Sequence, residues 1–360
     1  MIKFSIIVPV KAVSKNIAKE LIPALEKQKR RDFELIIVAD GKKEGIALSP
    51  APRNDWRRKA GMTKMDSGQA RMTDVKVRMI FSPSKAGPAD KRDLGADKAR
   101  GEILVFIDDD AYPAKDWLKN ALVNFDKSEV AGVGGPGITP PSDSLRQKVS
   151  GHVWSTWLGA GGAGVYRNRL GKKREVDDYP TFNLLVRKKD FGKIGGFDSN
   201  FWPGEDTKLC HDLVYKLGKK IVYDPRVLVY HHRREVFGAH LRQISRFAVH
   251  RGHFARILPK TSRRLSYFMP GLFVLFLTLS LFLIALLEIF SLCFISIPLY
   301  LFYFTLLLLY LFLLIFTGIQ IGIKEKEWRI GALLVPAIAA THLLYGILFI
   351  KGFVTKRLER

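Results

Sequence analysis

The sequence predicts an α/β domain with a mostly parallel sheet, followed by a membrane domain on its C-terminal side. Three observations lead to this prediction. Short apolar runs alternate with helical patterns through residues 1–235, which is typical of parallel strands covered by helices. The next stretch, 236–264, is basic and amphipathic. Charged residues then become rare within 265–360, where the apolar stretches are long enough to cross a bilayer.

Short apolar runs within 1–235 are the predicted strands: Phe4–Val10, Phe33–Ala39, Val75–Phe81, Ile103–Ile107 and Val130–Val133. Helical patterns separate them near 13–25, 89–100 and 115–125. In folds of this kind, ligands bind beyond the carboxyl ends of the strands. We therefore look for the site at Asp40 and at Asp108–Asp110, which follow two of these runs.

Basic residues dominate the composition and give a formal net charge of +24. They concentrate beside the apolar stretches and in 42–74, which has no sustained apolar period and is predicted to be a mobile surface insertion. No RRM, KH or zinc-finger pattern accompanies them, so we expect lipid headgroups and phosphates as partners and no nucleic acid. Two cysteines exclude a disulfide scaffold.

The membrane domain is predicted to contain two spans, near Phe268–Leu287 and Ile297–Ile321, with a third candidate at Ile330–Ile350. Met1–Val10 resembles a strand rather than a signal peptide. Arg263 and Arg264 precede the first span, so the positive-inside rule places the preceding domain in the cytoplasm, at the cytoplasmic membrane. A third crossing would put the basic tail on the far side. Either the third segment does not cross, or the tail is an exception to the rule.

The carboxylates after the strand Ile103–Ile107 are the first candidate site. Three consecutive acids at the end of a buried strand repel one another, and a divalent cation relieves that repulsion. Carboxylate oxygens suit Mg²⁺ or Mn²⁺, which would bridge the oxygens of a diphosphate. A solvated acidic turn that caps the next helix is the alternative. The second site is Glu205-Asp206, which supplies either a general base or only a helix cap.

These segments together resemble the family 2 glycosyltransferases, which are inverting enzymes of the GT-A fold. The resemblance extends, in order, through FSIIVPV at 4–10, Asp40-Gly41, GPADKRDLGADKARGEILVFIDDD at 87–110, GGFD at 195–198, GED at 204–206 and YDPRVLVYHH at 223–232. It implies a GT-A catalytic domain within 1–235 that binds a nucleotide-diphosphate sugar.

The resemblance also implies roles for individual residues. Pro9 and Asp40 would flank the nucleobase, and Asp206, beside Glu205, would be the catalytic base. Asp108 and Asp110 would form the DxD motif, with His231 near the metal. The remaining donor contacts would come from Arg92, Asp109 and Asn183, although a structural hydrogen bond suits Asn183 equally. Two departures from the family pattern are Ala39, where a second acid is frequent, and Asp93, where Asn is frequent.

The basic stretch 236–264 has apolar residues at helical spacing, which predicts a juxtamembrane helix in the headgroup region. Within it, Gln243–Phe247 resembles the QxxRW motif of membrane-bound polysaccharide synthases. By that resemblance Gln243 and Arg246 would approach the diphosphate and Phe247 the acceptor; an interfacial helix without this role is the alternative. The glycine-rich run Gly159–Gly164 lacks a P-loop pattern, and we predict a flexible loop there.

The predicted function is therefore a membrane-bound, metal-dependent inverting glycosyltransferase in cell-envelope polysaccharide or glycolipid synthesis. Its acceptor would be lipid-linked, such as a polyprenyl-linked glycan. A processive polysaccharide synthase is one alternative, and with so few spans it would need an oligomer or an export partner. A polyprenyl-phosphate monosaccharide transferase is another. The non-enzyme alternative is a membrane-anchored scaffold with a silent GT-A fold.

Overall fold

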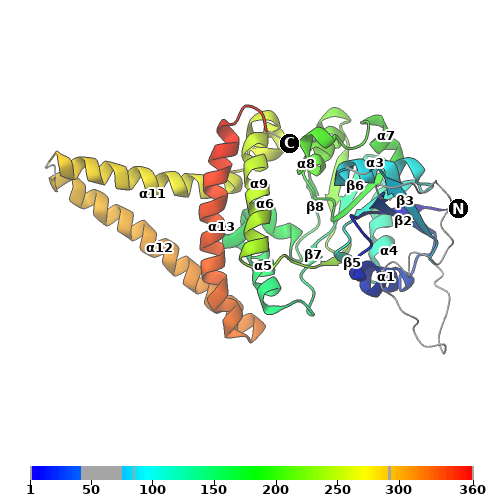
Figure 1. Cartoon of the computed structure of the whole chain (residues 1–360), viewed down its shortest axis with the longest axis horizontal. Helices are drawn as coiled ribbons and strands as arrows, with labels where there is room; N and C mark the ends of the chain where they lie inside the picture. Colours follow the sequence, from blue (N-terminus) through cyan, green and yellow to red (C-terminus); the bar gives the residue numbers. More distant parts are fainter. Residues whose placement is uncertain (1, 42–74, 84–85, 291–292, 359–360) are drawn as a thin grey trace. The chain divides into compact units, whose positions relative to one another are not determined.

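The computed structural model describes residues 2–41, 75–83, 86–290 and 293–358 (Figure 1). The predicted insertion at 42–74 lies outside them. The chain divides into two compact units, of which the first comprises Met1–Pro140 and Arg169–His232. The second comprises Pro141–Asn168 and Arg233–Arg360. The segment 141–168 therefore belongs with the C-terminal helices, although it lies within the range that we predict to be the catalytic domain.

The first unit is built on a sheet that has eight strands within the described residues, in the order β3-β2-β1-β4-β9-β6-β10-β8. The bounds of these strands are β1 Phe4–Pro9, β2 Phe33–Asp40, β3 Val77–Ser82, β4 Ile103–Ile107, β6 Val130–Gly134, β8 Arg174–Val176, β9 Asn183–Arg187 and β10 Lys220–Tyr223. Strands β3, β2, β1 and β4 are mutually parallel, β6 pairs in parallel with β10, and β9 runs antiparallel to both β4 and β6. The predicted α/β fold with a mostly parallel sheet is confirmed.

Helices cover both faces of this sheet, because its central strands are apolar on both sides. On one face, Ile6 and Val8 of β1 pack in a core with Leu21 and Leu25, from the helical turns η1 Ile17–Leu21 and α1 Ile22–Glu26. Trp117 of α4 Trp117–Leu122 joins this core. Each such fully buried side chain contributes roughly 1.5–3 kcal/mol.

The other face carries α3 Pro88–Lys98, which Figure 1 shows on the opposite side of the sheet from α1 and α4. Gly95 lets α3 approach closely, since a methyl group there would lie 2.5 Å from the Ile7 side chain.

A small second sheet extends the first unit beyond the end of β4. It pairs β5 Ala111–Pro113 with β11 Val229–His231, and β11 with β7 Gly137–Ile138. Because β5 follows the three acids directly and His231 lies opposite Ala111, this sheet brings two distant parts of the sequence together. The helices α7 Lys188–Lys193 and α8 Glu205–His211 follow β9, and the turn η5 Asp212–Lys216 leads to β10.

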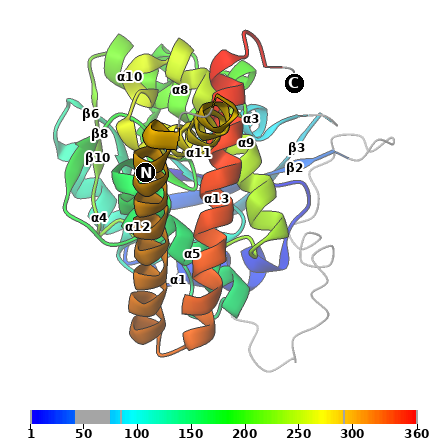
Figure 2. The same cartoon turned by 90° about the vertical axis from the view of Figure 1, so that its left-hand side faces the viewer.

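The second unit is helical within the described residues. Its helices are α5 Leu145–Ser155, α6 Trp157–Gly164, α9 Gly238–Ile257, α10 Pro259–Ser262, α11 Leu265–Ile289, α12 Cys293–Glu325 and α13 Trp328–Val354. Three of them, α11, α12 and α13, are long and apolar enough to cross a membrane. These three helices contain the predicted spans. Figure 1 and Figure 2 show α12 and α13 diverging from the turn at which they meet, where Gly322 packs on Trp328.

The predicted flexible loop at Gly159–Gly164 is wrong in part: these residues belong to α6, but the helix is interrupted at Gly161, whose φ is +62°. Thr156 caps this helix by accepting a hydrogen bond from the backbone N–H of Gly159 at 3.3 Å. Leu158 packs on the core of the second unit, and its carbonyl oxygen lies 2.9 Å from Nε2 of His342. Capping and packing thus stabilise the helical turns on either side of Gly161, although each glycine in a helix costs about 1 kcal/mol.

Candidate active site

Asp108, Asp110 and His231 form the centre of the candidate site. The strand β4 is fully buried and ends at Ile107, so the acids that follow it lie at the carboxyl edge of the sheet. Pairing of β11 with β5 brings His231 to them. The ligand atoms of the three side chains all lie within 4.8 Å of one another, and Nε2 of His231 lies 3.1 Å from Oδ1 of Asp110. The structure therefore brings the three predicted metal ligands together.

Their chemistry fits a divalent cation. Two carboxylates and one imidazole can enclose a single ion, and carboxylates that converge in this way repel one another without one. The ring of His231 is half-buried, and its Nδ1 is buried without a hydrogen-bond partner among the described residues. Such an unsatisfied nitrogen is costly in a purely structural histidine. The group can hold a metal ion.

Asp109 lies between the two predicted ligands in sequence but is not part of the metal group. Burial, reinforced by the neighbouring charges of Asp110 and Asp108, raises the pKa of Asp109 to about 6. The hydroxyl of Ser14 donates to its carbonyl oxygen at 3.4 Å. Burial is the main cause of the raised pKa, and the two neighbouring charges add to it; a cation would relieve the second contribution.

Arg92 joins this acidic edge to α8. One guanidinium nitrogen lies 2.9 Å from Asp108, the other lies 2.8 Å from Glu205, and the arginine side chain is only 6% exposed. Its predicted role as a phosphate contact stays a prediction, since in this structure both terminal nitrogens bind carboxylates. Sequence reasoning missed these ion pairs, because no local pattern links residues 92 and 205.

Glu205 and Asp206 begin α8 but face different surroundings. Glu205 is 6% exposed and bound to Arg92, and burial raises the pKa of its carboxyl group. Asp206 is half-buried, and its Oδ1 accepts a hydrogen bond from the backbone N–H of Thr207 at 2.7 Å. Thr207 in turn donates to the buried Asp178 at 2.9 Å, which fixes this first turn. Of the two acids, Asp206 is the more exposed.

Pro9 and Asp40 are the last residues of the neighbouring strands β1 and β2, which form where the apolar runs in the sequence predict strands. Nζ of Lys91 lies 2.6 Å from the Asp40 carboxylate and donates to the carbonyl oxygen of Val10 at 2.7 Å. Lys91 is nearly buried, so this single acid has a fixed cationic partner. Lys91 is a second site residue that the sequence analysis did not predict. Its position next to the predicted site residue Arg92 on α3 could have suggested it.

Asp93 supports the GGFD turn from the same helix. Its Oδ1 accepts a hydrogen bond from the backbone N–H of Phe197 at 3.0 Å. Gly196 has a φ of +81°, and a methyl group there would lie 2.7 Å from Oδ1 of Asp93. Burial raises the pKa of Asp93 to about 6. The unusual acid at this position therefore holds the turn that precedes α8.

Asn183 lies inside the protein rather than at an open surface. Its side-chain amide donates to the carbonyl oxygens of Gly135 and Val227, and its Oδ1 accepts from the indole of Trp117 at 2.9 Å. It is 0% exposed. These bonds favour the structural alternative, so we leave Asn183 out of the proposed donor contacts.

Gln243, Arg246 and Phe247 lie on α9, in the second unit. Arg246 is exposed, Gln243 is half-buried, and the ring of Phe247 packs edge-on against Trp154 with a centroid distance of 6.1 Å. Their contribution to the donor and acceptor sites stays a prediction.

The fold is a GT-A-like α/β fold whose mostly parallel sheet presents Asp108, Asp110 and His231 at one carboxyl edge, and Arg92 links that edge to the acidic start of α8. Comparison with known proteins gives the family. The Glycosyl transferase family 2 model matches residues 5–195, and the model of Glycosyl transferase family group 2 matches residues 103–319. The chain belongs to glycosyltransferase family 2.

Individual relatives are more distant. The chain is 28% identical over 160 residues to the pre-mycofactocin glycosyltransferase of Mycobacterium tuberculosis. The aligned region covers 44% of this chain and 33% of that protein. It therefore spans only a third of the length of this relative. It is 26% identical over 246 residues to the amylovoran biosynthesis glycosyltransferase AmsB of Erwinia amylovora, covering 66% of this chain and 72% of AmsB.

A solved structure shows the same fold. The mannosyltransferase PcManGT from Pyrobaculum calidifontis, in complex with GDP-Man and Mn²⁺, superposes with a TM-score of 0.52 at 17% identity. The match covers 99% of this chain and 88% of that one. At this identity the likeness shows the fold alone.

Proposed function

We propose that this chain is a membrane-bound, metal-dependent inverting glycosyltransferase that moves a sugar from a nucleotide-diphosphate donor to a lipid-linked acceptor. The convergence of Asp108, Asp110 and His231 at the edge of the sheet is the observation that carries the proposal. Family membership supplies the reaction class, and the apolar helices of the second unit supply the reason for a lipid-linked acceptor.

The donor would lie along the carboxyl edge of β1, β2 and β4. Pro9 and Asp40 would flank the base, with Lys91 fixing the Asp40 carboxylate. A divalent ion held by the Asp-Asp-His group would neutralise charge on the departing diphosphate. The imidazole ligand favours Mn²⁺ over Mg²⁺, since nitrogen donors prefer transition metals. The fold neighbour PcManGT was solved with GDP-Man and Mn²⁺, which supports this assignment.

Asp206 would serve as the catalytic base. Its carboxylate takes the proton from an acceptor hydroxyl, the oxygen attacks the anomeric carbon, and the bond to the diphosphate breaks with its electron pair. A single displacement inverts the configuration at that carbon. Glu205 is unsuited to this role because Arg92 occupies its buried carboxylate. It would instead keep α8 in place.

The acceptor is proposed to be a hydroxyl of a lipid-linked glycan at the cytoplasmic membrane, with the catalytic unit in the cytoplasm. Arg263 and Arg264 precede α11, which fits that orientation. Relatives include a glucosyl-dolichyl phosphate glucuronosyltransferase of Haloferax volcanii, 20% identical over 220 residues, or 59% of this chain and 63% of that protein. AmsB, named for amylovoran biosynthesis, supports a role in polysaccharide assembly.

Sugar transfer by membranes that contain the full chain tests the proposal. A panel of radiolabelled nucleotide sugars is offered with lipid extract, with and without EDTA, followed by Mn²⁺ or Mg²⁺. We expect transfer that EDTA abolishes and Mn²⁺ restores. Asp206→Asn should lower kcat by roughly 100-fold or more, the usual contribution of a general base. The matched control Asp97→Asn, on an exposed residue of α3, should change nothing.

The same assay separates the alternatives. Transfer that survives Asp206→Asn would indicate an acceptor that is already ionised, as a polyprenyl phosphate is. Long products from purified enzyme would indicate the processive synthase that Gln243–Phe247 suggests. Metal-independent transfer would contradict the assignment of the Asp-Asp-His group.

A further inference from the structure

The helix α13 differs from α11 and α12 in how much of it the protein itself buries. A third of its apolar window, 33%, is buried, against 11% for each of the other two helices. Beyond its first turn, its exposed residues form a narrow stripe at intervals of three, four and seven residues: Ala332, Pro336, Leu343, Ile347, Lys351 and Val354. Such a stripe is typical of a helix that rests on protein along most of its surface.

The second half of α13 runs against α9, backbone to backbone. A methyl group at Gly352 would lie 1.9 Å from the carbonyl oxygen of Val249, and one at Gly252 would lie 2.1 Å from that of Phe349. Close approach through glycine is a common way for helices to pack tightly in membranes. These contacts fix α13 at the depth of α9.

Hydrogen bonds extend the α9–α13 contact over several turns. His240 near the start of α9 bonds Thr341 at 3.1 Å, and His253 near its end bonds the carbonyl oxygen of Thr355 at 3.1 Å. The two helices therefore run in the same direction from residue 341 onward. Figure 1 shows them side by side.

The helix α9 is too polar to lie in the hydrocarbon core. It carries Arg242, Arg246, Arg251 and Arg256, and the first two are exposed. An arginine at the bilayer centre costs roughly 2.5–3.5 kcal/mol or more. Since α9 stays at the headgroup level, the half of α13 that is fixed to it stays there too.

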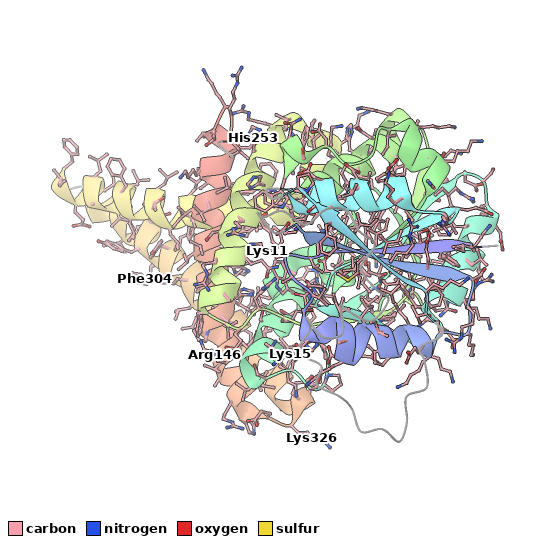
Figure 3. The ribbon with its side chains drawn as sticks, turned by 45° about the vertical axis from the view of Figure 1, so that its right-hand side comes forward. Lys11, Lys15, Arg146, His253, Phe304 and Lys326 are labelled. Carbon is pink, nitrogen blue, oxygen red and sulfur yellow. The ribbon has the colours of Figure 1, made fainter. Side chains whose placement is uncertain are left out.

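The first half of α13 begins at the polar end of α12. A methyl group at Gly331 would lie 2.3 Å from the carbonyl oxygen of Gly318, and Gly322 packs on Trp328. Lys324 lies in the last turn of α12, Lys326 lies in the turn between the helices and Arg329 is in the first turn of α13, with Glu325 and Glu327 beside them. Figure 3 shows Lys326 at this turn and Phe304 on α12, far from it along the helix.

We propose that α13 does not cross the membrane, and that it lies along the membrane surface beside α9 while α11 and α12 alone span the bilayer. The exposed stripe of α13 would then contact lipid at the boundary between the headgroups and the acyl chains. Both ends of α13 are then on one side, with Lys326 and Lys356 at the same face of the membrane. The basic residues before α11, in the α12–α13 turn and in the tail all obey the positive-inside rule. This inference does not depend on the sugar chemistry.

Single-cysteine labelling of the full chain tests the topology. In a Cys293→Ser background, Lys326→Cys and Lys356→Cys report the two ends of α13, and Ile289→Cys reports the far end of α11; all three positions are exposed. A membrane-impermeant maleimide is applied to right-side-out and to inside-out vesicles. The buried Cys210 leaves the parent variant as an unlabelled control.

We expect Lys326→Cys and Lys356→Cys to be labelled in the same vesicle orientation. In that orientation each should react about tenfold or more faster than in the opposite one, because the basic flanks lie on one side of the membrane. Ile289→Cys should not share their orientation. Labelling of Lys326→Cys and Lys356→Cys from opposite sides would overturn the proposal, because α13 would then cross. Arg329→Cys and Arg357→Cys, also exposed, repeat the comparison if either lysine variant does not accumulate.

Discussion

Arg92 and Glu205 form a buried ion pair, 2.8 Å long, that joins α3 to the first turn of α8. The second terminal nitrogen of Arg92 binds Asp108, so one guanidinium links a proposed metal ligand to the helix of the proposed base. The ring of Phe197 lies 5.8 Å from the Arg92 guanidinium carbon and covers it. The spacing between donor site and base therefore depends on this arginine.

Arg92→Met should destabilise the protein strongly, because Glu205 would be left buried without its cation. Breaking one side of a buried pair costs about 3–5 kcal/mol. Arg92→Met combined with Glu205→Gln should be more stable than Arg92→Met alone, since no buried charge remains. Thermal unfolding of the detergent-purified chain measures both. A double variant less stable than Arg92→Met would show that the pair is not what holds α8.

Asp93→Asn should stabilise the protein at neutral pH. The asparagine still accepts the hydrogen bond from Phe197 and removes a partly buried charge. Because burial raises the pKa of Asp93 from 3.8 to about 6, the carboxyl favours folding below pH 4, and that advantage is lost as the pH rises through 6. After allowance for partial solvent exposure, the gain at pH 7.5 is about 1 kcal/mol.

Thermal unfolding at two pH values checks the Asp93 prediction. At pH 7.5 the variant should melt a few degrees above the wild type, and at pH 4.5 the difference should fall to about a third of that. Asp97→Asn, an exposed change on the same helix, should show no such pH-dependent gap. An equal gap at both pH values would mean that the charge of Asp93 is not the cause.

Asp40, Asp108 and Asp110 can be placed from sequence alone, because a buried apolar strand that ends in acids indicates a site at the carboxyl edge. His231 cannot be placed in this way, since it reaches the site through the pairing of β11 with β5, far apart in the chain. Only the family resemblance points to it.

The partners of these acids depend on how α3 and α8 are rotated against the sheet. Lys91 binds Asp40 while the adjacent Arg92 binds Asp108, a division that no helical periodicity predicts. The loop prediction at Gly159–Gly164 is wrong in part for a similar reason: glycine favours a loop locally, and the cap at Thr156 together with the packing of Leu158 on distant helices outweighs that preference.

His231→Asn should lower the affinity for the metal ion and leave the stability of the fold nearly unchanged. Loss of one ligand from the Asp-Asp-His group should raise the Mn²⁺ concentration for half-maximal transfer by roughly 10- to 100-fold. His232→Asn is the matched control, because the neighbouring ring bonds Glu20 at 2.7 Å instead of the metal group. Titration of Mn²⁺ into metal-free membranes measures the shift. Equal shifts in the two variants would argue against a ligand role for His231.

Asn183→Leu should be among the most destabilising single changes in the first unit. The buried amide satisfies the carbonyl oxygens of Gly135 and Val227 and the indole N–H of Trp117. Each group left unpaired costs about 1–3 kcal/mol, so the total reaches several kcal/mol despite the similar side-chain volume. Asn183→Asp should be comparably destabilising at neutral pH, because it keeps an acceptor for Trp117 but places a buried carboxylate against the carbonyl oxygens of Gly135 and Val227.

Protease resistance of the membrane-embedded chain at rising temperature measures the stability of the Asn183 variants. If Asn183 instead contacts the donor sugar, both variants should retain wild-type resistance and lose only sugar transfer. A large loss of stability in both variants is the outcome that the buried hydrogen bonds require.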